Sequence, residues 1–89
     1  MVNRVFFSDE ARQDIELIKC YFDQSGQGNE FLEDLFTQTD FLKLFPDGFQ
    51  IRYKGIRIIN FEVFKYSIHY EFINKEIRIY RILHQNQSY

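Results

Sequence analysis

The chain has 89 residues, with 11 Lys and Arg, 13 Asp and Glu, 11 Phe, 6 Tyr and one Cys. This length fits a single domain over residues 1–89, and a hydrophobic share of 45% excludes a disordered chain. The lone Cys20 excludes an intrachain disulfide, and we expect it to be a half-buried structural thiol. No stretch reaches the roughly 18 apolar residues of a membrane span, and no signal peptide opens the chain. We expect a cytoplasmic protein.

Charge is unevenly distributed along the sequence. Residues 1–45 hold four bases and nine acids, net −5, whereas residues 46–89 hold seven bases and four acids, net +3. The positive half can attract an acidic partner or a phosphate backbone. The total of −2, however, is far from the basic excess of dedicated nucleic-acid-binding proteins. Charge alone therefore leaves the partner open.

Two helices are predicted after a short strand over residues 3–7. Ser8 is a typical N-cap residue, and the acids behind it suit the helix dipole. Apolar residues then recur at spacings of four, three and four, which predicts an amphipathic helix over residues 8–24. They are Ala11, Ile15, Ile18 and Phe22. The glycines of segment 25–28 reverse the chain, and a second helical pattern over residues 29–44 completes an antiparallel hairpin.

The sequence after Pro46-Asp47-Gly48 predicts strands, because this turn stops the second helix. Short strands are expected over residues 49–53 and 56–60. Segment 65–72 alternates between apolar and polar residues, which predicts one buried and one solvated face. His69 lies in the polar phase of this strand, so it is expected to be a surface histidine.

The last strand is expected to form a hairpin with segment 65–72. Asn74-Lys75 has the length of a two-residue hairpin turn, and the shift of phase between Ile79 and Ile82 predicts a bulge near Arg81. The order of elements predicts an α+β fold. In this fold an N-terminal strand precedes an antiparallel helical hairpin, which packs on a curled antiparallel sheet of three to four strands.

Basic side chains on or beside the predicted strands are the main candidate for a functional site. A concave sheet with several guanidinium groups can bind phosphates or carboxylates, and a histidine there titrates near neutrality. The candidates are Arg52, Lys54, Arg57, Lys65, Arg78, Arg81 and His84. Alternatively, they form the ordinary polar face of a half-solvated sheet, paired across strands with Glu62, Glu71 and Glu76. No glycine-rich phosphate loop, metal-ligand cluster or nucleophile motif occurs, so we expect no metal and no cofactor.

Five segments together resemble the RelE/ParE superfamily of toxins from bacterial type II toxin-antitoxin modules. Their order, their spacing and the chain length agree with the superfamily over nearly the whole chain. The segments are Glu10-Ala11-Arg12-Gln13-Asp14-Ile15-Glu16, Phe45-Pro46-Asp47-Gly48, Gly55-Ile56-Arg57, Phe64-Lys65-Tyr66-Ser67-Ile68-His69-Tyr70-Glu71, and Ile77 to Gln85, which ends in Ile82-Leu83-His84-Gln85.

The resemblance implies a small toxin that a cognate antitoxin holds inactive. RelE-like members cut messenger RNA in the ribosomal A site, whereas ParE-like members inhibit DNA gyrase and have no established catalytic residues. Gln87 stands where such chains often end with Arg, and the net charge is mildly acidic. Both departures favour a ParE-like, non-enzymatic toxin of a plasmid stabilisation system. The alternatives are a ribosome-dependent endoribonuclease and a degenerate toxin that only binds its antitoxin.

The resemblance also suggests site residues for each activity. A nuclease would use Arg57, Arg81 and His84 on the phosphate, with Arg52 and Lys54 as further cations and Tyr89 as a C-terminal tyrosine. For the antitoxin, 11 Phe exceed what a small core can hide, so an aromatic groove between the hairpin and the sheet edge is expected. Its expected lining is Phe31, Phe36, Phe41 and Phe64, although these rings could instead complete the core.

Overall fold

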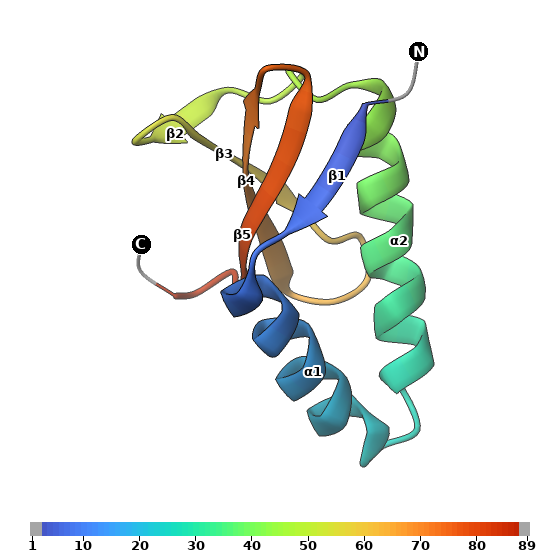
Figure 1. Ribbon diagram of the computed structural model, residues 1–89. Helices are drawn as coiled ribbons and strands as arrows, with labels where there is room; N and C mark the ends of the chain where they lie inside the picture. The colour runs from blue at the N-terminus through green and yellow to red at the C-terminus, as the bar shows by residue number, and fades with distance from the viewer. Residues whose placement is uncertain (1–2, 88–89) are drawn as a thin grey trace.

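A computed structural model describes residues 3–87, and the expected elements are all present in it (Figure 1). Tyr89 lies outside the described residues. The elements are β1 (Arg4–Phe7), α1 (Asp9–Asp23), α2 (Gly28–Leu44), β2 (Ile51–Tyr53), β3 (Ile56–Asn60), β4 (Tyr66–Ile73) and β5 (Glu76–His84).

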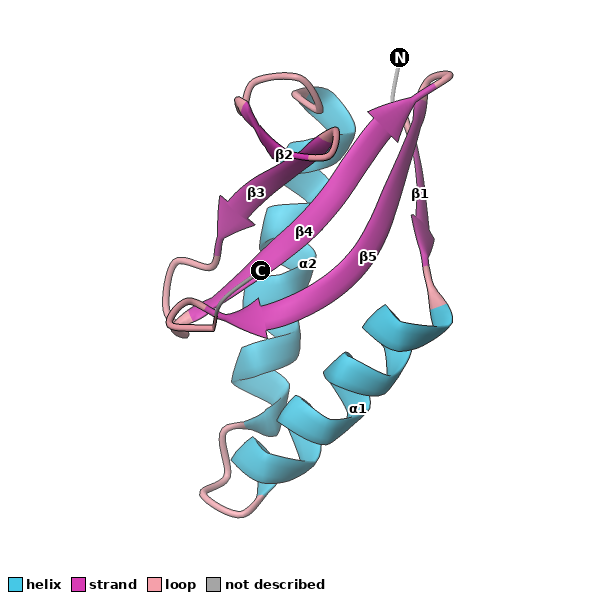
Figure 2. Cartoon of the chain, turned by 90° about the vertical axis from the view of Figure 1, so that its left-hand side faces the viewer, coloured by secondary structure: helices cyan, strands magenta, loops and turns pink. Residues whose placement is uncertain are grey.

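One sheet of order β1-β5-β4-β3-β2 contains every strand. The pairs β2–β3, β3–β4 and β4–β5 are antiparallel, as predicted. The strand near the N-terminus joins the same sheet parallel to β5, with Val5 opposite Ile77, so the sheet is mixed. In Figure 2, α2 lies behind the sheet and α1 lies below it. The fold is therefore α+β, with helices on one face of the sheet.

The end of β1 and the start of α1 are fixed by one side chain. The backbone N–H of Ala11 donates to Ser8 Oγ at 3.0 Å, so Ser8 is the N-cap that the sequence predicts. The same hydroxyl donates to the carbonyl of Tyr80 at 2.8 Å, which joins the cap to β5. At the other end of α1, Gly28 begins α2 so close to α1 that a Cβ would overlap the carboxylate of Asp23. Any other residue there would force the Asp23 side chain to move, so glycine favours this close approach of the two helices.

Aromatic rings fill the space between the helices and the sheet. Phe31 stacks on Phe61 with ring centroids 5.4 Å apart, and Phe22 meets Phe64 edge-on at 4.7 Å. Phe31 is completely buried and Phe64 is 8% exposed. The prediction that Phe31 lines an exposed groove is therefore wrong, whereas Phe64 also lines a cavity of about 480 Å³ beside Phe22. Both rings complete the core, because a sheet this small needs large side chains to cover it.

The hairpin and the bulge predicted for the last two strands are both confirmed. Asn74 and Lys75 have φ values of 52° and 62°, the left-handed pair that a two-residue turn of type I′ requires. His69 lies opposite Arg81 and Tyr70 lies opposite Ile79, so Tyr80 is the extra residue of a bulge. Near the bulge, backbone groups of β5 bond to side chains at α1. The carbonyl of Tyr80 accepts from the Ser8 hydroxyl, and the N–H of Ile82 donates to Asp14.

Two sequence predictions of exposure are wrong. His69 is only 2% exposed, and its neighbour Ser67 on the same face of β4 is 4% exposed. β4 is the central strand of the sheet, and its second face is covered by Tyr53 of β2 and by the turn after β5. Cys20, expected to be half-buried, is exposed because it points away from the apolar stripe of α1. Neither helix in the described part of the chain is long and apolar enough to cross a membrane.

Candidate functional site

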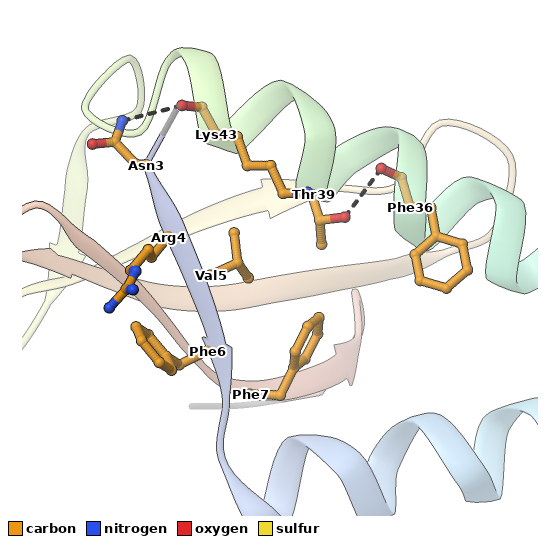
Figure 3. A pocket seen from close by; sticks show the side chains of 8 residues that line it. All are labelled: Asn3, Arg4, Val5, Phe6, Phe7, Phe36, Thr39 and Lys43. Atoms are coloured by element: carbon orange, nitrogen blue, oxygen red, sulfur yellow. Dashed lines mark hydrogen bonds between the residues drawn. The ribbon is translucent and has the colours of Figure 1, made fainter. Parts of the chain in front are cut away.

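The edge strand β1 forms one wall of a groove of about 720 Å³ between β1 and α2 (Figure 3). Because β1 is last in the sheet order, one of its edges pairs with β5 and no strand of residues 3–87 pairs with the other. Such an edge can accept a further strand. The groove is lined by Asn3, Arg4, Val5, Phe6, Phe7, Phe36, Thr39 and Lys43.

Side chains from both faces of β1 line the groove. Val5 and Phe7 point toward α2 and also pack on the core, whereas Arg4 and Phe6 point the other way (Figure 3). Asn3 closes one end, since its backbone N–H and its side-chain amide both donate to the carbonyl of Lys43 at 3.1 Å. These contacts hold β1 against α2 at a fixed separation.

Exposed rings on both walls give the groove its apolar character. Phe6 of β1 is 44% exposed and Phe36 of α2 is 55% exposed. Two cations, Arg4 and Lys43, flank these rings, and Lys43 also pairs with Asp40 on α2 at 3.4 Å. An unpaired strand edge beside exposed aromatic rings is typical of a protein-binding surface.

Of the four phenylalanines predicted for an antitoxin groove, only Phe36 lines this one. Phe41 is 45% exposed but lies outside the lining, against Phe45 at 5.2 Å and Phe49 at 6.0 Å. The sequence missed the β1 side of the groove altogether. Segment 3–7 was recognised as a strand, but its place at the sheet edge depends on pairing with β5, for which no local pattern exists.

Arg57, a candidate for phosphate chemistry, is engaged inside the protein. Its Nη1 donates to the carbonyl of Phe49 and to that of Asp47 at 3.4 Å. The hydroxyl of Tyr70 donates to the carbonyl of Pro46 at 2.8 Å. Together these side chains hold the connection between α2 and β2, whose carbonyl groups have no strand to pair with. Burial raises the pKa of Tyr70 to about 12, so its hydroxyl stays a donor at neutral pH.

Arg81 is likewise engaged, with Asp14 of α1. Nε donates to Oδ2 at 2.8 Å and Nη2 to Oδ1 at 3.1 Å. The hydrogen bond to the Asp14 carboxylate raises the pKa of Arg81 above its ordinary value. Arg81 and His84 line a common cavity of about 190 Å³ with Asp14, but Arg57 does not line it. The structure therefore brings two of the three proposed nuclease residues together and leaves Arg57 apart.

The remaining basic residues do not follow the cross-strand pairing considered from the sequence. Arg78 pairs with Glu76 at 2.9 Å, but both belong to β5. Glu71 accepts a hydrogen bond from the hydroxyl of Tyr80 at 2.9 Å. His84 packs its ring on Tyr66 with centroids 5.2 Å apart, and its Nδ1 accepts from the backbone N–H of Asn86 at 3.1 Å. Within residues 3–87, no group of His, Cys, Asp and Glu side chains could hold a metal ion.

Comparison with known proteins agrees with this architecture. The sequence profile of the family described as "ParE toxin of type II toxin-antitoxin system, parDE" matches residues 5–89. A solved structure of the chromosomal ParDE toxin-antitoxin system from P. aeruginosa superposes with a TM-score of 0.79 at 18% sequence identity, covering 93% of this chain and 96% of that one. No curated protein matches significantly.

Proposed function

This chain belongs to the family of ParE toxins of type II toxin-antitoxin systems, and from that premise we propose that it inhibits growth by binding DNA gyrase and that a cognate antitoxin neutralises it. The observation that carries the antitoxin part is the groove between β1 and α2, which combines an unpaired strand edge with exposed rings.

An extended antitoxin segment fits this groove best. Its backbone pairs with the free edge of β1, and every second side chain enters the groove beside Phe36. Arg4 and Lys43 flank the apolar floor, so a carboxylate at either end of the segment adds favourable charge. The partner is therefore a strand-forming segment with alternating apolar residues and acidic ends.

The internal contacts of the basic residues support a binding toxin over a nuclease. A nuclease needs cations that are free to stabilise the phosphate in the transition state. Arg57 donates to two backbone carbonyls, and Arg81 is bound by both oxygens of Asp14. These contacts give both arginines a structural role, which accounts for their positions without a catalytic role.

The antitoxin part is tested by two charge insertions on α2. Phe36→Glu places a carboxylate in the groove and should weaken binding to the product of the neighbouring antitoxin gene at least about tenfold. Phe41→Glu is the matched control, because Phe41 is an exposed ring of the same helix outside the groove, and should change the dissociation constant less than about twofold. Equal losses in both variants, or none in Phe36→Glu, would place the antitoxin elsewhere.

The target is tested with the purified toxin. It should inhibit DNA supercoiling by gyrase, and the antitoxin should restore supercoiling. Induced expression should produce DNA-damage signalling and intact messages. Codon-periodic cuts in translated messages with unaffected supercoiling would instead establish the endoribonuclease, and antitoxin binding without any growth inhibition would establish a degenerate toxin.

A further inference from the structure

The sheet has a second open edge, at the opposite end from β1. In the order β1-β5-β4-β3-β2, the strand β2 is last, and within residues 3–87 only β3 pairs with it. Ile51 and Arg52 of this three-residue strand are exposed. Figure 1 shows the connection from α2 running along one end of the sheet into β2, whose turn to β3 projects away from α2. An exposed edge strand of this kind can pair with another chain.

Exposed apolar side chains continue from this edge onto α2. Phe41 is 45% exposed, Phe45 is 54% exposed and Ile51 is 52% exposed. The Phe41 ring contacts those of Phe45 and the half-buried Phe49, with centroids 5.2 and 6.0 Å apart. Alternation in an extended chain places Ile51 on the same side as Phe49. These four residues form one surface, the β2-edge patch, and exposed apolar patches of this kind mark protein interfaces.

The β2-edge patch is separate from the groove between β1 and α2. None of its four residues lines that groove. Phe41 follows Phe36 by five positions, which is roughly 140° around a helix of 3.6 residues per turn. The two rings therefore lie on different flanks of α2, Phe36 toward β1 and Phe41 toward the segment before β2. A partner on the β2-edge patch leaves the groove free for the antitoxin.

Charges of opposite sign lie at the two ends of the β2-edge patch. Asp47 is exposed in the connection after α2, whereas Arg52 and Lys54 are exposed on β2 and in the turn that projects away from α2. A partner whose charge has a single sign would be repelled at one end. A second copy related by a two-fold axis places each acidic end opposite a basic end, and it also sets the two β2 strands antiparallel. The patch is therefore complementary to itself.

We propose that two copies of this chain associate through the β2-edge patch. The two β2 strands pair edge to edge, the rings and Ile51 of both copies pack together, and Asp47 of each copy faces Arg52 of the other. Because β2 has only three residues, few backbone hydrogen bonds form and the apolar side chains supply most of the affinity. The dimer is therefore in reversible equilibrium with the monomer. This association requires neither gyrase binding nor an antitoxin.

Sedimentation velocity of the purified whole toxin over a concentration series tests the association. The average mass should rise from that of one chain toward that of two. Phe45→Glu and Ile51→Glu should each raise the dimer dissociation constant about tenfold or more, because each buries a charge in an apolar contact. Leu17→Glu is the matched control, since Leu17 is an exposed apolar residue of α1, and it should change the constant less than about twofold.

A charge exchange tests the two-fold arrangement without altering the apolar contact. Arg52→Glu and Asp47→Lys should each weaken self-association about fivefold or more at low salt, because each places like charges opposite one another in both halves of the dimer. An equimolar mixture of the two variants should associate about as tightly as the unmodified toxin. In the mixed dimer the two reversed charges attract in one half and the original pair remains in the other.

Three results would overturn the proposal. One is a toxin that stays monomeric up to concentrations on the order of 1 mM, where even a very weak dimer would form. Another is a dimer that Phe45→Glu and Ile51→Glu leave intact, or a mixture that associates no more tightly than either charge variant alone. The third is a monomeric toxin whose inhibition of gyrase is lost in Ile51→Glu, which would assign the β2-edge patch to gyrase.

Discussion

Arg81 donates two hydrogen bonds to Asp14, which also accepts the backbone N–H of Ile82 at 2.9 Å. One carboxylate thus binds a side chain and a backbone group of β5 immediately after the bulge at Tyr80. The Asp14 side chain is 14% exposed and the Arg81 side chain 48% exposed, so the two partners differ in how much their loss should cost. This contact anchors α1 to the sheet.

Asp14→Ala should lower the free energy of unfolding by about 2 kcal/mol, because it leaves the N–H of Ile82 without its acceptor. Arg81→Ala should cost less than about 1 kcal/mol, since a half-exposed ion pair is well screened. Urea unfolding of both variants measures the difference. Equal losses would show that the ion pair, and not the backbone hydrogen bond, is the anchor.

Asp34 provides a pH-dependent contact between α2 and the connection from β3 to β4. Its carboxylate accepts the backbone N–H groups of Glu62, Val63 and Phe64 at 3.1, 2.8 and 3.1 Å. Burial alone raises the pKa of Asp34, but these hydrogen bonds outweigh it, so the pKa lies below the ordinary 3.8. The stabilisation is fully present above the unfolded-state pKa and is lost as the pH falls through the folded-state pKa.

Asp34→Asn should therefore lower the free energy of unfolding by about 2 kcal/mol at pH 7. The gap to the unmodified protein should narrow below about pH 4, where the carboxyl group of the latter takes up its proton. Urea unfolding between pH 2.5 and 7 measures this, with the exposed Glu33→Gln on the same helix as a control. A gap that stays constant over this range would mean that ionisation of Asp34 does not contribute.

His69 should resist protonation. Burial, and to a smaller extent the positive charge of Arg81, lower its pKa below 6.5. As the pH falls below about 6.5, the unfolded chain takes up this proton before the folded one does, so stability decreases. Between pH 6.5 and 5, the free energy of unfolding should fall less in His69→Gln than in the unmodified protein, because glutamine does not titrate.

The same histidine can be followed directly by NMR titration of its ring. Its pKa should lie below 6.5 and should rise in Arg81→Ala, because that change removes a nearby positive charge. A ring that titrates at or above 6.5 would be incompatible with its burial beneath Tyr53.

Arg57→Ala should lower the free energy of unfolding by about 1–2 kcal/mol, because the carbonyls of Asp47 and Phe49 lose their donor. The neighbouring Arg52→Ala should change it by less than about 0.5 kcal/mol, since Arg52 is exposed. Thermal and urea unfolding give both values. If Arg57→Ala left the free energy of unfolding unchanged but abolished growth inhibition, Arg57 would have a functional role and not a structural one.

Features with a local cause were predictable from the sequence. Ser8 caps the first helix, Asn74-Lys75 makes the hairpin turn, and the phase shift before Ile82 reveals the bulge, since each depends on a few adjacent residues. Helical and alternating periods likewise gave the elements of the fold.

Features that depend on distant residues were not predictable in the same way. Alternation in β4 identified two faces but not that the second is covered, so His69 was misplaced. In the sequence, Asp34 resembles any acid near the beginning of a helix. In the structure, its carboxylate accepts backbone N–H groups from the connection after β3. The candidate groove depends on β1 lying at the sheet edge, and that position follows only from its pairing with β5.

The parallel pairing of β1 with β5 also affects the order of events during synthesis. β1 leaves the ribosome before both helices, yet its partner residues Glu76 to Ile79 emerge after these helices and three other strands. Contacts between segments so distant in sequence form slowly. The apolar face of the helical hairpin therefore stays uncovered until β5 has been synthesised. A truncated chain that lacks β5 therefore has neither a finished sheet nor the groove, and a partial translation product cannot take up an antitoxin there.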